Sequence, residues 1–168
     1  NIQVALANQF TPFLYPNQYV NFNQNSNAVA VSNQVVAGAG DELGIVTNVF
    51  NYVVDNLTYD YDKAATVQSG YLPNVDATLA SKNGICFDYA SLMTSMLRAQ
   101  DIPTKLVIGY TGELYHAWIS VYLKGQGWVD DIIYFDGANW SLMDPTFASS
   151  GGKSFGAGDS SYQAKYAY

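Results

Sequence analysis

The chain has 168 residues, 49 % of them apolar, which is the size and composition of one globular domain with its own core. Seven Lys and Arg stand against fourteen Asp and Glu, and the formal net charge of -7 repels nucleic acid and anionic lipid surfaces. The sequence has no run of about 18–20 apolar residues, the length that a membrane-spanning helix needs. We therefore expect neither a nucleic-acid partner nor a membrane span in this chain.

The single cysteine, Cys86, has no partner for a disulfide within the chain, so the cysteine count does not identify the compartment. The low Lys and Arg content, the fourteen Tyr and the many Asn and Gln are similar to the composition of secreted or surface-displayed bacterial domains. We expect an extracellular or cell-surface location. Because the chain begins with Asn1 rather than Met, we expect any signal or anchor segment to lie outside this sequence.

The first half of the sequence predicts an arm followed by a helix. Residues 1–27 contain two prolines and alternate polar with apolar residues, and a polar stretch continues to residue 40, so we expect an extended arm over residues 1–40 with at most a short strand. Over residues 41–57, apolar residues recur every three or four positions, as on the buried face of a helix. Asp41 is favourable near the positive end of that helix.

The second half predicts one more helix and then a sheet. The helix begins near Asn83 or Gly84 and ends before Pro103, since the residue preceding proline avoids the helical conformation. Four later runs rich in β-branched and aromatic residues, separated by turn residues, predict antiparallel strands at 104–111, 116–123, 127–135 and 140–143. The Gly- and Ser-rich residues 149–168 predict a weakly ordered tail, and one last strand within it is an open alternative.

Cys86 falls in the first turn of the second predicted helix, and two interpretations stay open. A cysteine in an apolar helical stripe is usually buried and inert. In a first turn, however, the unpaired amides and the positive helix end stabilise a thiolate and an oxyanion. On the second interpretation we expect a partly exposed thiol with a pKa well below ~8.5, the ordinary value.

A thiolate nucleophile needs a proton shuttle, and His116 is the only histidine. It begins a predicted strand thirty residues after Cys86, so a helix, a strand and a turn can return the chain beside the helix start. The alternative is a surface or packing histidine. Asp144 is the candidate to orient the imidazole, and Asp130 and Asp131 are alternatives. Asp144 precedes a proline, so it is also typical of a turn.

Five stretches, "GICFDYA", "LRAQDIP", "LVIGY", "HAWISVY" and "MDPTF", occur in this order and resemble the transglutaminase-like superfamily of papain-like fold over residues 41–148. The resemblance implies an α+β fold in which N-terminal helices and the nucleophile helix pack on an antiparallel β-sheet. It also implies that Cys86 is the nucleophile, His116 the general base and acid, and Asp144 the residue that orients the imidazole. The layout is then an arm at 1–40, a catalytic core at 41–148 and a tail at 149–168, forming a single domain.

The sequence departs from the family pattern in two places. Asp101 stands where the family usually has glycine, at a position that favours a left-handed conformation. An additional hairpin-like stretch, "VDDIIYFDG", separates His116 from Asp144 and contains the two alternative aspartates. Asp144 is preferred because Trp140 and the Pro-Thr that follows Asp144 match the family's approach to its aspartate.

The implied reaction is acyl transfer through a thioester on a protein or peptide substrate, resolved by water or by an amine. Neither a metal nor another cofactor is required by the sequence. A non-catalytic binding or scaffold module and a glycopeptide amidase are the alternatives. Aromatic residues could line a substrate groove or the core, with Trp118 expected to pack: Tyr89, Tyr110, Tyr115, Trp118 and Trp128.

Overall fold

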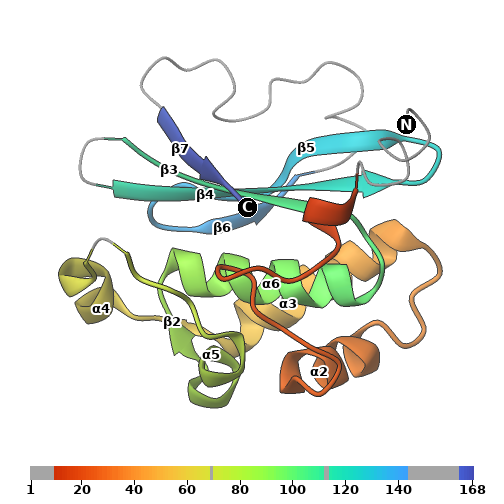
Figure 1. Cartoon of the computed structure of the whole chain (residues 1–168), viewed down its shortest axis with the longest axis horizontal. Helices are drawn as coiled ribbons and strands as arrows, with labels where there is room; N and C mark the ends of the chain where they lie inside the picture. Colours follow the sequence, from red (N-terminus) through yellow and green to blue (C-terminus); the bar gives the residue numbers. More distant parts are fainter. Residues whose placement is uncertain (1–9, 69, 112–113, 144–162) are drawn as a thin grey trace.

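The molecule has two layers, a group of helices and an antiparallel sheet that lies across them (Figure 1). The computed structural model describes residues 10–68, 70–111, 114–143 and 163–168. The α+β fold expected from the sequence is confirmed.

The helical layer is built from the first hundred residues. Its elements are the 3-10 turn η1 (Thr11–Phe13) and the helices α2 (Asn27–Val35), α3 (Glu42–Asn56), α4 (Tyr61–Thr66), α5 (Val75–Ser81) and α6 (Cys86–Ala99). Helix α3 confirms the prediction for residues 41–57, and its N-cap Asp41 accepts a hydrogen bond from the Gly44 amide.

Helix α2 corrects the expectation of an extended arm over residues 1–40. Ala28 and Ser32, which are four residues apart, are both buried, and the Ser32 hydroxyl donates to the Met96 carbonyl of α6 at 2.8 Å. Contact with α6 therefore favours a helix in a stretch whose polar composition gave little local indication of one.

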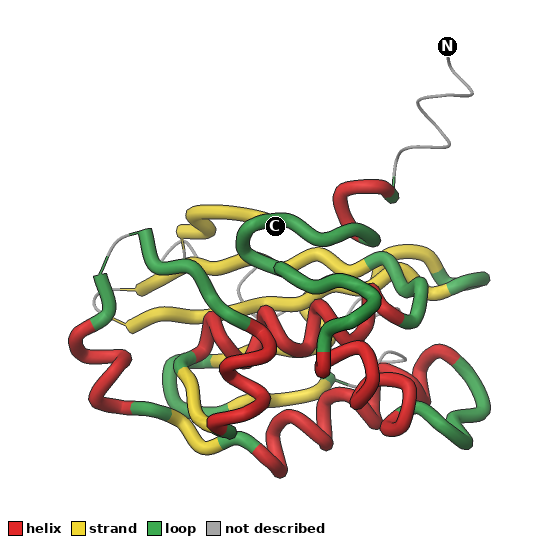
Figure 2. The backbone as a smooth tube through the Cα atoms, turned by 60° about the horizontal axis from the view of Figure 1, so that its bottom comes forward, coloured by secondary structure: helices red, strands yellow, loops and turns green. Residues whose placement is uncertain are grey.

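The sheet contains β3 (Thr104–Thr111), β4 (Leu114–Leu123), β5 (Gly127–Phe135), β6 (Trp140–Leu142) and β7 (Gln163–Ala167). Their spatial order is β6-β5-β4-β3-β7, and all neighbouring pairs are antiparallel. Figure 2 shows the strands of the sheet side by side, with helices along one face. The four predicted strands are confirmed within two residues at each end. The last strand considered for the tail is β7, which pairs with β3 at the sheet edge.

Helix α6 begins later than the sequence predicted because the preceding residues pair with another segment. Asn83 and Gly84 form β2 (Asn83–Gly84), which lies parallel to β1 (Thr58–Tyr59). The N-cap is consequently Ile85, and Cys86 is the first helical residue. The helix ends at Ala99, and Asp101 has a φ of 60°, as the family's glycine at that position implied.

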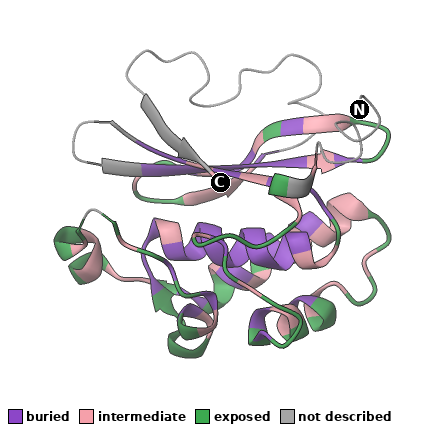
Figure 3. Ribbon diagram, viewed as in Figure 1, coloured by how far each residue is buried: buried purple, intermediate pink, exposed green. Residues whose placement is uncertain are grey.

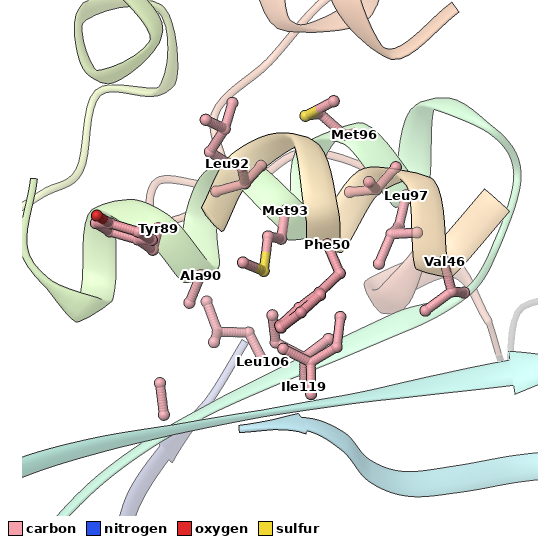
Figure 4. Close-up of a cluster of buried hydrophobic side chains, with 14 of the residues drawn as sticks. Val46, Phe50, Tyr89, Ala90, Leu92, Met93, Met96, Leu97, Leu106 and Ile119 are labelled. Atoms are coloured by element: carbon pink, nitrogen blue, oxygen red, sulfur yellow. The ribbon is translucent and has the colours of Figure 1, made fainter. Parts of the chain in front are cut away.

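Helix α6 is the centre of the molecule, with twelve of its fourteen residues buried between the other helices and the sheet (Figure 3). Its Met93 lies in a cluster with Phe50 of α3, Leu106 of β3 and Ile119 of β4 (Figure 4). This packing fixes the helix axis, and with it the position of the first turn that carries Cys86.

Candidate active site

The thiol of Cys86 is buried at the start of α6, with the residue only 3 % exposed. Burial raises its pKa to about 12, and the charge of Asp88 adds to this. Hydrogen bonds from backbone amides and from the Tyr59 side chain act in the opposite direction. The expectation of a partly exposed thiol with a low pKa is therefore wrong for this structure, because the loss of water outweighs the stabilisation offered by the helix start.

Tyr59 connects Cys86 to the sheet. Its ring stacks on Phe135 of β5 with 5.3 Å between the centroids. Phe135 in turn pairs with Ala117 of β4, the residue that follows His116. Ala117 and Cys86 belong to the same apolar cluster. The start of α6 thus lies at the level where β4 begins and β5 ends.

His116 is also buried, being 5 % exposed, and its ring stacks on that of Trp118 with centroids 5.8 Å apart. Burial lowers the pKa of His116, whereas the charge of Asp136 raises it. Trp118 is buried as well, as expected of a packing residue. The pairing of His116 with Cys86 stays a prediction.

Asp136 is a functional candidate that the sequence analysis missed. It follows Phe135, and because Phe135 pairs with Ala117, the register places Asp136 beside His116. Amide hydrogen bonds from Asn139 and Ala138, and the charge of His116, hold the pKa of Asp136 below its ordinary value. The register counted back from the β4–β5 turn would pair His116 with Tyr134. The irregularity in the pairing between Ile119 and Val121 brings Asp136 opposite His116 instead, and the sequence alone does not give that irregularity.

The structure describes two of the three aspartates that were considered from the sequence. Asp144 lies outside the described residues. Asp130 is exposed on β5. Asp131 has a φ of 55° at an irregularity in the β4–β5 pairing, and its amide donates to the Ser120 hydroxyl at 3.0 Å. The assignment of Asp144 as the residue that orients the imidazole stays a prediction.

A second buried carboxylate, Asp88, anchors the first turn of α6. It accepts hydrogen bonds from the Ile85 amide at 2.9 Å, the Lys63 ammonium at 2.9 Å and the Tyr71 hydroxyl at 2.5 Å. Lys63 also hydrogen-bonds to Tyr71. Asp88 is fully buried, whereas the side chain of Lys63 is 34 % exposed. The partners of Asp88 come from α4 and from the segment before α5, and no local pattern in the sequence relates them to the start of α6.

Half-buried aromatic rings surround Phe87, the residue after the thiol. Its ring centroid lies 5.9 Å from Tyr19, 5.8 Å from Tyr168 and 6.5 Å from Tyr71. Four segments that are distant in sequence therefore form an aromatic surface next to the start of α6. Its members are different from the groove candidates named from the sequence.

The aromatic residues that the sequence suggested for a substrate groove lie away from the surface around Phe87 or outside the described side chains. Tyr89 is buried and stacks on Trp140 at 5.6 Å. Trp128 packs against Phe13 and lies under the Lys105 ammonium, 4.5 Å from it. The side chains of Tyr110 and Tyr115 lie outside the described part of the chain.

Among the described residues, no group of three or more His, Cys, Asp or Glu side chains is placed to hold a metal ion. The same residues include no helix with the length and apolar character to cross a membrane.

Comparison with protein families gives a match between residues 29–130 and the transglutaminase-like superfamily. Over 103 residues the chain is 30 % identical to the UPF0252 protein MJ1282 of Methanocaldococcus jannaschii, a match that covers 54 % of this chain and 29 % of MJ1282. It is 30 % identical over 112 residues to the protein YebA of Bacillus subtilis, covering 56 % of this chain and 14 % of YebA. The matched region is thus less than a third of either relative.

Solved structures share the fold. A candidate cysteine protease from Cytophaga hutchinsonii superposes with a TM-score of 0.58 at 19 % identity, over 99 % of this chain and 56 % of that protein. The periplasmic domain of TgpA from Pseudomonas aeruginosa gives a TM-score of 0.53 at 20 % identity, over 80 % of this chain and 49 % of that domain.

Proposed function

The chain belongs to the transglutaminase-like superfamily, and on that premise we propose that it catalyses cysteine-dependent acyl transfer or amide hydrolysis on protein or peptide substrates. One observation carries the proposal: the single cysteine of the chain is the first residue of the central helix, where backbone amides act on its sulfur. An extracellular or cell-surface location is part of the proposal, supported by the composition and by the similarity to a periplasmic domain.

In the proposed reaction, Cys86 Sγ forms a bond to the carbonyl carbon of an amide while its proton passes to His116. Collapse of the tetrahedral intermediate breaks the carbon–nitrogen bond, and His116 returns the proton to the leaving amine. Water or a second amine then attacks the thioester and loses a proton to His116, and the thiol is regenerated on protonation. Asp144 orients the imidazole throughout.

The protonation states support a mechanism in which His116 removes the thiol proton of Cys86 during the attack on the substrate. They do not support a thiolate–imidazolium pair that exists before the substrate binds. Burial raises the pKa of Cys86 to about 12 and lowers the pKa of His116. At neutral pH the thiol and the imidazole are therefore both uncharged before the substrate binds. The proton must leave sulfur as the carbon–sulfur bond forms, which requires a positioned base.

The proposal is tested by incubating the protein with a glutamine-containing protein and a fluorescent primary amine, beside the Cys86→Ser variant. Amine incorporation with release of ammonia would indicate a transglutaminase, and cleavage of the protein would indicate a protease. Either activity should disappear in Cys86→Ser. An activity that survives in this variant would refute the role of Cys86.

A binding or scaffold module is the second candidate, and two observations favour it. The thiol is protonated and buried, and the half-buried rings of Tyr19, Phe87 and Tyr168 lie beside it. This candidate predicts that neither reaction occurs with any protein substrate, and that peptide binding is unchanged by Cys86→Ser.

A further inference from the structure

We propose that Lys63 is a positioning residue for Cys86 and that it acts through the carboxylate of Asp88. By offsetting the charge of that carboxylate, Lys63 allows the first turn of α6 to hold the negative charge that develops at Cys86 during the reaction. The inference rests on the proposed function. Lys63 lies outside the five stretches of sequence that resemble the family.

The first turn of α6 is closed by the side chain of Asp88. Asp88 is fully buried and lies two residues after Cys86. The N-cap residue, Ile85, has no side-chain atom that can accept a hydrogen bond, and the Asp88 carboxylate instead accepts the Ile85 amide at 2.9 Å. The carboxylate that shapes this turn therefore belongs to the same turn as the nucleophile.

The negative charge of Asp88 opposes the proposed reaction. The Cys86 sulfur gains negative charge as its proton leaves, and the carbonyl oxygen of the substrate gains it in the tetrahedral intermediate. Burial is the main cause of the raised pKa of Cys86, and the charge of Asp88 adds to it. A turn shaped by this carboxylate therefore needs a cation that offsets its charge.

Lys63 supplies that cation. Its Nζ lies 2.9 Å from Asp88 Oδ2, the oxygen that also accepts the Ile85 amide. The Tyr71 hydroxyl donates to Asp88 Oδ1 at 2.5 Å. The Ile85 amide and the Tyr71 hydroxyl are neutral donors, so within this cluster the positive charge is that of Lys63. Arg98, the cation of α6 itself, lies in the last turn of the helix.

The backbone holds Lys63 at the start of α6. Asp60, the N-cap of α4, accepts the Lys63 amide at 2.9 Å. The Asp60 amide in turn donates to the Gly84 carbonyl at 2.9 Å, which ties α4 to the chain that leads into α6. The Lys63 ammonium also hydrogen-bonds to Tyr71 and lies 4.5 Å from the centroid of its ring. The cation is thus in place before any substrate binds.

Other titratable groups near the start of α6 set the background for the test. Asp55 of α3 is exposed, and Asp76 of α5 accepts hydrogen bonds from the first amides of α2. Lys105 of β3 lies against the ring of Trp128. The remaining groups are retained in every variant of the test: Tyr59 of β1, Tyr61 of α4, Tyr89 of α6 and His116 of β4.

The test is the second-order rate of alkylation of Cys86 by iodoacetamide, measured between pH 7 and 10 for the wild type and Lys63→Met. Burial disfavours the charge of Lys63, but its hydrogen bonds to Tyr71 and Asp88 outweigh burial and raise its pKa, so it is charged over this range. We expect the apparent pKa of Cys86 to rise in Lys63→Met and alkylation at a fixed pH to slow by about tenfold, the effect of one pKa unit.

The direction of the change separates an electrostatic role from a structural one. If Lys63 only held the turn together, Lys63→Met would expose the buried thiol and alkylation would become faster. Lys63→Arg keeps the cation and should alkylate nearly like the wild type. Lys63→Gln keeps a donor for the carboxylate without the charge, and it should slow alkylation even if Lys63→Met does not fold. Melting is followed on the same samples, and rates are compared where all variants are folded.

A double variant, Lys63→Met with Asp88→Asn, tests whether Lys63 acts through Asp88. Asparagine keeps an oxygen for the Ile85 amide and removes the negative charge, so the double variant should alkylate faster than Lys63→Met. Equal rates in these two variants would overturn the inference.

Lys82→Met is the matched control, because Lys82 is exposed four residues before Cys86 and carries the same charge. It should alkylate like the wild type. An unchanged or faster rate in Lys63→Met and Lys63→Gln, or an equal slowing in Lys82→Met, would overturn the inference. Alkylation requires no turnover, so slowed alkylation in Lys63→Met together with an active Cys86→Ser would reject the proposed function and leave the effect of Lys63 on the thiol standing.

Discussion

The backbone of Gly84 lies so close to Asp88 that a Cβ atom at position 84 would be 2.7 Å from the Asp88 Cβ and 3.0 Å from its Oδ2. The side chain of Asp88 therefore folds back over the chain that leads into α6, where it accepts the Ile85 amide. A residue without a side chain is required two residues before Cys86 because the carboxylate of Asp88, which caps the helix, occupies the space.

Gly84→Ala is expected to destabilise the protein by about 1–3 kcal/mol, the usual cost of overpacking a buried position. The new methyl group displaces Asp88, which is held on its other side by Lys63 and Tyr71. Urea unfolding measures the loss. Gly40→Ala is the control, since a Cβ at Gly40 meets nothing within 4 Å, and an equal loss in both variants would contradict the steric explanation.

Lys63→Met should destabilise the protein by removing the cation from a buried carboxylate. Breaking a buried ion pair costs ~3–5 kcal/mol, but Lys63 is one-third exposed and Tyr71 still donates to Asp88, so we expect about 2 kcal/mol. Thermal or urea unfolding gives the value, with exposed Lys124→Met as the control. A loss below about 0.5 kcal/mol would mean that the ion pair contributes no more than an ordinary surface pair.

Stability should fall as the pH rises above about 9, because Cys86 keeps its proton longer in the folded state than in the unfolded state. Its folded pKa is about 12 against a reference of 9.0 for the thiol in the unfolded chain, so the contribution is complete below pH 9 and is lost between pH 9 and 12. By pH 10 the loss from this one group is about 1 kcal/mol. Tyr89, whose pKa is also raised to about 12 by burial, and Tyr59 add to the decline.

Cys86→Ala isolates the contribution of the thiol, because the variant retains both tyrosines. We expect it to be less stable than the wild type by about 1 kcal/mol at pH 7, through lost packing of a buried side chain, and to decline less steeply between pH 8 and 10. Urea unfolding at both pH values gives the comparison. Parallel declines would show that the thiol has no raised pKa in the folded protein.

Asp136→Asn should lower the pKa of His116 further, since it removes a negative charge that favours the imidazolium. The asparagine oxygen can still accept from the amides of Ala138 and Asn139, so the turn should persist. The single histidine of the chain gives one pair of ring proton signals, Hδ2 and Hε1, which are followed by NMR against pH. An unchanged pKa, beside exposed Asp130→Asn as the control, would exclude a direct effect of Asp136.

Asp144→Asn is expected to reduce turnover strongly with little change in melting temperature, because the imidazole is left free to adopt the wrong tautomer. The serine-protease precedent for this loss is ~10⁴ in rate. Asp130→Asn and Asp131→Asn should each change turnover by less than about tenfold. If one of these two gives the larger loss while Asp144→Asn stays active, the orienting residue lies on β5.

Local pattern in the sequence was enough for most elements of the core. The three- and four-residue spacing of apolar residues identified α3, and β-branched runs with intervening turn residues identified β3, β4, β5 and β6. Pro103 and the residue before it marked the end of α6. These features depend on neighbours within a few positions, which is the range over which helix periodicity, strand alternation and turn chemistry operate.

Tertiary contacts decided the features that depend on distant segments. Helix α2 forms against α6, and the pairing of β1 with β2 moves the start of α6 to Cys86. The burial of the thiol reverses the expected direction of its pKa, because desolvation is set by the elements packed around Cys86 and not by its place in the helix. The placement of Tyr59 and Asp136 likewise follows from strand pairing, and pairing register joins residues that no local pattern in the chain relates.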